Sequence, residues 1–141
     1  EETGMSFAQE VEMIRLAAEK DLITTPYVFS EVDAEAMAKA GADIIVCHLG
    51  LTTGGSIGAE TAFKLPDCPK VVDDWAAAAL AVNPDAIVLV HGGPVAMPEA
   101  ADFVLKNTKN CHGFYGASSM ERVPAEVALK EQTEKFKKIG R

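Results

Sequence analysis

The sequence has no long apolar segment and few basic residues, and both absences narrow its function. No apolar run approaches the roughly 20 residues that a membrane-spanning helix needs. Thirteen lysines and arginines stand against 21 aspartates and glutamates, which gives a net charge of -8. Nucleic-acid backbones and anionic membranes both favour a basic surface, so neither is expected as the main partner.

Cysteine is scarce, and no two cysteines form a C-x-x-C pair. Cys47, Cys68 and Cys111 are scattered and odd in number, so they cannot all pair with one another. We interpret them as reduced thiols of a cytoplasmic protein rather than as a metal site. Residues 1–4 read EETG, without an initiator methionine or a signal segment. We expect that a preceding segment has been removed.

A well-known motif of nucleotide binding is also missing, because no Gly-Lys-Ser/Thr triplet marks a Walker A loop. What the chain does have is 141 residues of ordinary globular composition, 48% hydrophobic and 24% charged. No linker or low-complexity tract divides it, so residues 1–141 are expected to form a single domain with no internal boundary.

Apolar periodicity predicts a leading helix followed by four strand–helix units. The expected helices cover residues 5–20, 30–41, 69–82, 98–106 and 120–139, and the expected strands cover 22–29, 43–49, 86–90 and 112–115. Trp75, Phe103 and Phe136 are expected on the buried faces of their helices. Continuous apolar strands that alternate with helices indicate a parallel sheet in an α/β protein.

Two architectures fit this order of elements. Four βα units are half of the eight in a (β/α)8 TIM barrel of about 250 residues. The leading helix has no strand of its own, which favours the C-terminal half of such a barrel over a free-standing open sheet. In both architectures the functional face lies at the C-terminal ends of the strands. A half-barrel leaves an open edge on each side, so we expect a homo-oligomer.

Histidines mark this predicted functional face. His48 and His91 stand at or near the ends of neighbouring strands, where an imidazole can serve as acid, base or electrophile. A lone histidine is more often a satisfied core residue, but two at equivalent positions favour a catalytic role. Glu60, in a glycine-rich loop, is a candidate base or metal ligand. His112 begins a strand at the opposite end and is interpreted as structural.

Small residues in the loops after the third and fourth strands predict anion binding. Glycines let the backbone approach a phosphate, and a helix that begins after the loop offers free N–H groups. The expected ligands are Gly92, Gly93, Gly116, Ala117, Ser118 and Ser119, with Arg122 as a fork for a carboxylate or phosphate. The alternatives are that a serine only caps the helix and that Arg122 only forms helix-surface pairs. The loop over residues 50–61 is either a lid or a disordered connector.

Four stretches carry a resemblance that covers nearly the whole chain: VEMIRLAAEKDLITTPYVF, AGADIIVCHLGLTTGGSIGAET, NPDAIVLVHGGP and HGFYGASSMERVPAE. They resemble the TIM-barrel phosphoenolpyruvate hydrolase-like family, also called the TIM-barrel signal-transduction family. That family occurs alone and joined to Tm-1-like ATP-binding domains. The resemblance implies a (β/α)8 barrel of which this chain is the second half. It adds Thr52, Thr53, Gly54 and Gly55 to the pocket residues named above.

The family name implies hydrolysis of a small phosphorylated enol acid. Similar barrels use Mg²⁺, which makes Mg²⁺ the candidate cofactor, with metal-binding carboxylates upstream of this chain. Our first hypothesis is therefore a hydrolase or lyase-like enzyme that acts on a small phosphorylated or carboxylated metabolite. The second is a ligand-sensing module without turnover, and the third is a structural half-barrel that assembles by dimerisation. The missing N-terminal half-barrel and a Tm-1-like ATP-binding domain are the other expected partners.

Overall fold

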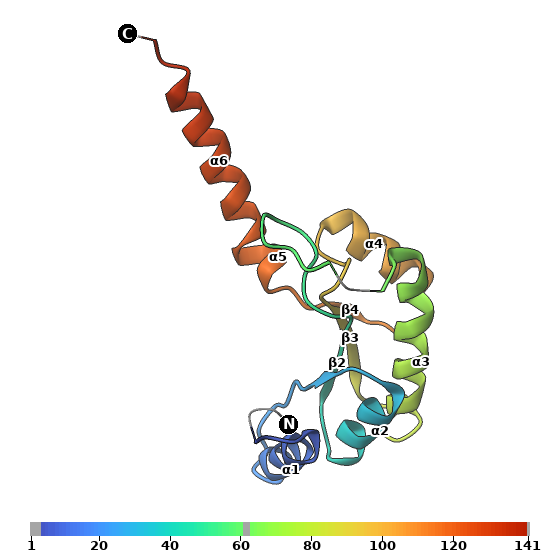
Figure 1. Ribbon diagram of the computed structural model, residues 1–141. Helices are drawn as coiled ribbons and strands as arrows, with labels where there is room; N and C mark the ends of the chain where they lie inside the picture. The colour runs from blue at the N-terminus through green and yellow to red at the C-terminus, as the bar shows by residue number, and fades with distance from the viewer. Residues whose placement is uncertain (1–3, 61–62, 141) are drawn as a thin grey trace.

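A four-stranded parallel sheet forms the centre of the computed structural model, which describes residues 4–60 and 63–140. The strands are β1 (Tyr27–Val28), β2 (Ile44–His48), β3 (Ile87–His91) and β4 (Gly113–Phe114). They lie in the order β1-β2-β3-β4, so each strand pairs with the next one in the sequence (Figure 1). This arrangement confirms the predicted α/β class and the parallel sheet.

Helices occupy the connections between the strands. They are α1 (Phe7–Ala18), α2 (Glu31–Lys39), α3 (Cys68–Leu80), α4 (Pro98–Asn107), α5 (Ser118–Glu121) and α6 (Val123–Lys137), with a short 3₁₀ turn, η1 (Leu65–Asp67), before α3. Local signals set several of these ends. Ser30 caps α2, because its hydroxyl oxygen accepts a hydrogen bond from the Asp33 N–H at 3.1 Å. Beyond the other end of α2, Gly41 has a φ of +92°, which favours glycine.

Proline changes two of the predicted elements. The strand expected over residues 22–29 is reduced to β1, because Pro26 has no N–H to donate to the sheet. The carbonyls of Thr24 and Pro26 still accept hydrogen bonds from β2 at 3.1 and 3.0 Å. The helix expected over residues 120–139 is broken between α5 and α6. Pro124 stands in the first turn of α6, where it cannot donate to the preceding turn.

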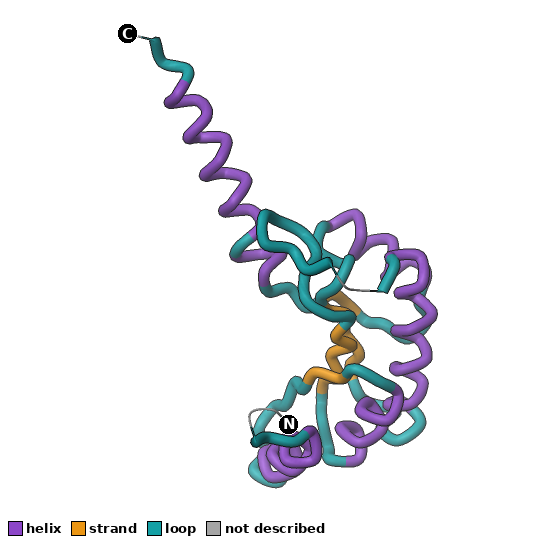
Figure 2. The backbone as a smooth tube through the Cα atoms, viewed as in Figure 1, coloured by secondary structure: helices purple, strands orange, loops and turns teal. Residues whose placement is uncertain are grey.

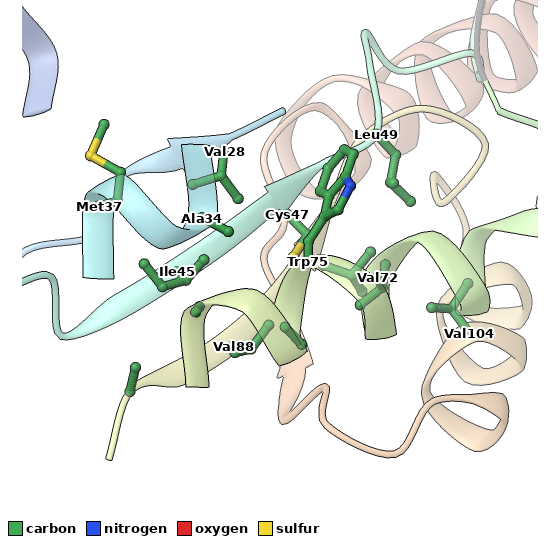
Figure 3. Close-up of a cluster of buried hydrophobic side chains, with 14 of the residues drawn as sticks. Val28, Ala34, Met37, Ile45, Cys47, Leu49, Val72, Trp75, Val88 and Val104 are labelled. Carbon is green, nitrogen blue, oxygen red and sulfur yellow. The ribbon is translucent and has the colours of Figure 1, made fainter. Parts of the chain in front are cut away.

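The hydrophobic core lies between one face of the sheet and the helices α2 and α3. Ile45 and Val88 of the strands belong to one buried cluster with Met37 and Trp75 of the helices (Figure 3). Trp75 is 7% exposed, as the sequence predicted. The same prediction is wrong for Phe103 on α4 and Phe136 on α6, which are 37% and 63% exposed.

Phe136 is exposed because α6 leaves the body of the protein. Figures 1 and 2 show this helix projecting away from the sheet towards the C-terminus. Apart from Val123 at its start, nearly all of its residues are exposed. An apolar residue on a predicted helix is buried only where a second element covers it, and sequence periodicity does not show which element does so.

Polar side chains close the amino ends of the strands. The Asp43 carboxylate accepts hydrogen bonds from the backbone N–H and the hydroxyl of Thr24, at 2.8 and 3.0 Å. The Thr24 hydroxyl oxygen in turn accepts the Asp43 N–H at 3.1 Å. His112 accepts the Val88 N–H on its Nδ1 at 2.9 Å. These bonds fix the backbone at this end of the sheet.

Candidate active site at the carboxyl ends of the strands

Four rings meet at the carboxyl ends of the strands: Tyr27, His48, His91 and Tyr115, here called the ring cluster. His48 and His91 are direct partners in the register of β2 and β3, and their ring centroids are 4.8 Å apart. Tyr27 stacks on His91 at 5.1 Å with an angle of 7° between the ring planes. The ring of Tyr115, which follows β4, lies 5.9 Å from His91. The structure therefore brings the two predicted histidines together.

The two tyrosines were not predicted as ligands or catalysts. From the sequence, Tyr27 is expected at the end of the first strand as a core or wall residue, and Tyr115 is only part of the fourth strand. The signal that identifies Tyr27 is its register: it pairs with Val46, two residues before His48, and so shares a face of the sheet with that histidine. Register depends on the folded sheet, so residue pattern alone does not supply it.

The two imidazoles hold their protons on opposite ring nitrogens. His48 accepts the Gly50 N–H on its Nδ1 at 3.1 Å, so the proton of the neutral ring is on Nε2. His91 Nδ1 lies 2.7 Å from the Tyr115 carbonyl oxygen, which can only accept, so Nδ1 carries the proton. The neutral pair therefore presents one Nε2–H donor, on His48, and one Nε2 lone pair, on His91.

Burial favours the uncharged forms of His48 and Tyr27. Burial lowers the pKa of His48, and the neighbouring His91 lowers it further. Burial also raises the pKa of Tyr27, with a smaller contribution from Tyr115. His48 is therefore neutral and Tyr27 protonated at neutral pH, so both can donate hydrogen bonds to an incoming anion.

The loops after β2 and β3 are bonded to each other through their backbones. Gly93 donates its N–H to the Gly50 carbonyl at 2.7 Å, and Thr53 donates its N–H to the Gly93 carbonyl at 3.1 Å. Gly92 and Gly93 have φ values of +75° and +57°. A Cβ on either glycine would lie 2.4 Å from a carbonyl oxygen, that of Gly50 or of Leu49 respectively. These glycines are therefore needed for the close approach of two loops.

The loop after β4 has a different construction. A Cβ on Gly116 would lie 2.6 Å from the Met120 side chain, so this glycine also permits a close contact. Ala117 occupies the capping position of α5, and Ser118 and Ser119 are the first helical residues, so neither serine is the N-cap. Their hydroxyls are half-buried beside the loop. Because α5 is a single turn, its dipole is weaker than that of the long helix expected from the sequence.

The loop over residues 50–60 is folded on itself. Ala59 donates its N–H to the Thr52 carbonyl at 3.1 Å, and a Cβ on Gly58 would lie only 2.0 Å from the Thr53 carbonyl oxygen. Glu60 is exposed at the end of this loop, next to residues 61 and 62, which lie outside the described part of the chain. The ring-nitrogen bonds of His48 and His91 go to Gly50 and Tyr115, not to Glu60.

Arg122 is bonded to the same loop. Its Nη2 donates to the Gly54 carbonyl at 3.0 Å, and its Nη1 pairs with Glu126 at 2.8 Å. Glu126 also accepts the Ser56 N–H at 2.8 Å. The sequence analysis left open that Arg122 forms only a helix-surface pair, and its ion pair with Glu126 is such a pair. The bonds of the two side chains to Gly54 and Ser56 were not predicted.

The site was also tested for a metal. Within residues 4–60 and 63–140, no group of three or more His, Cys, Asp or Glu side chains is placed to hold a metal ion. Mg²⁺ prefers carboxylate oxygens, so the residues described here do not fit it, and we derive no step through a metal.

Burial raises the pKa of Cys47 to about 12 and that of Cys68 to about 11, so both thiols are protonated at neutral pH.

The family of the chain follows from comparison with known proteins. The family model described as Phosphoenolpyruvate hydrolase-like matches residues 1–139. The chain belongs to the phosphoenolpyruvate hydrolase-like family. The match includes all four strands and the whole ring cluster, and it confirms the resemblance found in the sequence. None of the helices in the described residues is long and apolar enough to cross a membrane.

Relatives of this phosphoenolpyruvate hydrolase-like chain are found in a plant and a bacterium. It is 56% identical over 140 residues to the ToMV susceptible protein tm-1(GCR26) of Solanum lycopersicum and 55% identical to the ToMV resistance protein Tm-1(GCR237) of the same plant. It is 30% identical to a putative transcriptional regulatory protein, y4pA, of Sinorhizobium fredii. The matches cover 99% of this chain but only 19% of each tomato protein and 23% of the rhizobial one.

Proposed function

We propose that the chain is the C-terminal half of a (β/α)8 barrel whose strand ends form part of an active site for a small phosphorylated or carboxylated metabolite. The order β1-β2-β3-β4 has no reversal, whereas a doubly wound open sheet reverses its order at a switch point. This uninterrupted order supports a segment of a barrel.

The observation that carries the proposed activity is the opposite protonation of the two histidines. In hydrolysis of a phosphorylated enol acid, His91 would accept a proton from the attacking water on Nε2. His48 would donate a hydrogen bond from Nε2 to the oxygen that leaves phosphorus. Water supplies the oxygen that joins phosphorus, and the released enolate takes up a proton on carbon, so the products are inorganic phosphate and the keto acid. The family name supports this choice of reaction.

Backbone and hydroxyl groups next to the ring cluster would hold the anion. Gly92 adjoins His91 in the chain, and Gly116, Ala117, Ser118 and Ser119 follow Tyr115. The N–H of Gly93 is already bonded to the Gly50 carbonyl, so Gly93 would support the turn rather than bind the anion. Thr52 and Thr53, together with Gly54 and Gly55, belong to the loop that would cover the bound ligand, and Glu60 ends that loop. Backbone N–H groups in such tight turns form concave sites that favour anions.

Binding of inorganic phosphate tests the site in this chain, because the proposal makes the chain only half of the barrel. We expect phosphate to shift the backbone amide NMR signals of Gly92 and Ser119. Once the missing half-barrel is restored, phosphate release from phosphoenolpyruvate tests catalysis, with His91→Gln expected to lower the rate about 10²-fold. His112→Gln, at the opposite end of the sheet, is the matched control and should keep the wild-type rate. Equal rates in both variants would contradict the proposal.

A sensing module without turnover is the second candidate. The observation that favours it is the similarity to a protein described as a putative transcriptional regulator. A sensor would bind phosphate at the same amides and leave phosphoenolpyruvate unchanged. Measured binding together with the absence of phosphate release, once the missing half-barrel is restored, would decide for the sensor.

Assembly into a pseudo-barrel is the third candidate. Ile87 is 46% exposed on the face of the sheet away from the core, and β1 and β4 each pair with only one strand in the described residues. An unpaired edge favours association with another strand. We expect this isolated chain to dimerise, with the missing N-terminal half or a Tm-1-like ATP-binding domain as its partner in a longer protein. Sedimentation of a monomer at micromolar concentration would contradict the dimer.

A further inference from the structure

The ion pair between Arg122 and Glu126 differs from the other ion pairs of the chain. Its side chains are only 23% and 27% exposed, whereas those of the Lys106–Asp102 pair on α4 are 73% and 59% exposed. Both pairs join residues four apart on a helix. Only the first pair is also bonded to a distant loop, at a separation of about 70 residues in the sequence.

The loop meets this ion pair through two backbone groups. Arg122 accepts no hydrogen bond and donates one to the Gly54 carbonyl, and Glu126 accepts one from the Ser56 N–H. The two side chains are bonded to each other, so the contact forms a closed ring of hydrogen bonds. The bond from Ser56 is the main cause that lowers the pKa of Glu126, and Arg122 adds to it, so the carboxylate is charged at neutral pH.

Gly55, between those two backbone groups, fits closely against the ion pair. It has a φ of +88°, and a Cβ at this position would lie 2.4 Å from Arg122 Nη1 and 2.6 Å from Glu126 Oε2. A methyl group would therefore displace the ends of the Arg122 and Glu126 side chains from the loop. The positive φ also favours glycine here, independently of any anion that the loop covers.

We propose that Arg122 and Glu126 form a latch, a pair of positioning residues that hold the loop of residues 50–60 against the start of α6. Arg122 lies three residues after Ser119, so the latch joins the loop after β2 to the loop after β4. The bonds between Thr53 and Gly93 join the same loop to the loop after β3. That the latched loop covers a substrate rests on the proposed function, whereas the latch itself stands on these contacts.

Amide hydrogen exchange measures the latch directly. In Arg122→Ala the Ser56 N–H keeps its acceptor, Glu126, yet the latch predicts at least a tenfold faster exchange of Ser56 and Ala59. Asp102→Asn, which removes the exposed ion pair on α4, is the matched control and should leave loop exchange unchanged. Unchanged exchange in Arg122→Ala, or an equal increase across the whole sheet, would overturn the latch.

Gly55→Ala provides a second, independent variant. This variant keeps both latch side chains and inserts a methyl group between them and the loop. It should therefore speed the hydrogen exchange of the Ser56 and Ala59 amides without removing a charge. If Arg122→Ala does not fold, this variant decides the question by the same measurement. Hydrogen exchange of the Ser56 and Ala59 amides at the wild-type rate in Gly55→Ala would overturn the latch.

Phosphate titration separates the latch from the proposed function. If the wild-type chain binds inorganic phosphate, Arg122→Ala should weaken the affinity about tenfold, while Asp102→Asn keeps it. If the wild-type chain does not bind phosphate, the proposed anion site fails, and hydrogen exchange still confirms or overturns the latch. Fast loop exchange with unchanged phosphate affinity would overturn the positioning role of these residues at the anion site.

Discussion

The two ends of the sheet carry similar polar residues but use them differently. At the amino ends, Thr24 and Asp43 bond to each other and His112 bonds to the backbone of Val88. At the carboxyl ends, His48 and His91 each use one ring nitrogen to bond the backbone and leave the other for a ligand. His112 also bonds through one ring nitrogen, so the difference lies in the neighbours: the rings of His48 and His91 lie 4.8 Å apart and can act together on one ligand.

At the carboxyl ends, glycines let the loops after β2 and β3 bond to each other through their backbones. Gly93→Ala should break this arrangement most severely. The new Cβ would lie 2.4 Å from the Leu49 carbonyl oxygen at a φ of +57°. We expect the free energy of unfolding to fall by roughly 2–4 kcal/mol, measured by urea denaturation. Gly4→Ala is the control, since Gly4 has a φ of +81° but no atom within 4 Å. A loss in Gly4→Ala as large as that in Gly93→Ala would contradict the role of the loop contact.

Asp43→Ala should weaken the other end of the sheet by a smaller amount. It removes the acceptor of the N–H and hydroxyl of Thr24, which is only 4% exposed. Leaving these groups without a partner should cost about 1–3 kcal/mol of unfolding free energy. The NMR signals of the His48 and His91 rings should stay in place. Movement of those signals would show that the two ends are coupled and would weaken the comparison.

The titration of His48 should give the smallest effect. We expect its pKa, measured by NMR of the ring protons, to lie below the ordinary value and to rise in His91→Gln, which removes one of the two causes of the shift. Because folding lowers this pKa, the unfolded state binds more protons. The stability contributed by His48 is complete above about pH 6.5 and declines as the pH falls towards the lowered pKa. A His48 pKa that is unchanged in His91→Gln would show that burial alone sets it.

Sequence patterns predicted the features of this molecule that depend on neighbouring residues. The order of helices and strands follows from periodicity, and the helix expected over residues 30–41 contains α2. The meeting of His48 and His91 also followed, because both end strands that were expected to be parallel. The break before α6 has a visible signal in Pro124, which a regular helix does not accept.

The features that sequence patterns missed depend on contacts between distant residues. Tyr27 reaches the ring cluster through the register of β1 against β2. Gly92 and Gly93 were assigned to an anion, and in the structure they also admit the backbone of the neighbouring loop. No pattern within a single segment links Arg122 to Gly54. Such contacts become visible only when the three loops are placed side by side.

The uninterrupted strand order also has a consequence for how the chain is made. Each strand pairs with the strand synthesised just before it. A new βα unit can therefore pair with the edge of the preceding strand as soon as it leaves the ribosome. The sheet can therefore grow in the direction of translation, from β1 to β4. The ring cluster, which draws on all four units, is completed only when Tyr115 has left the ribosome.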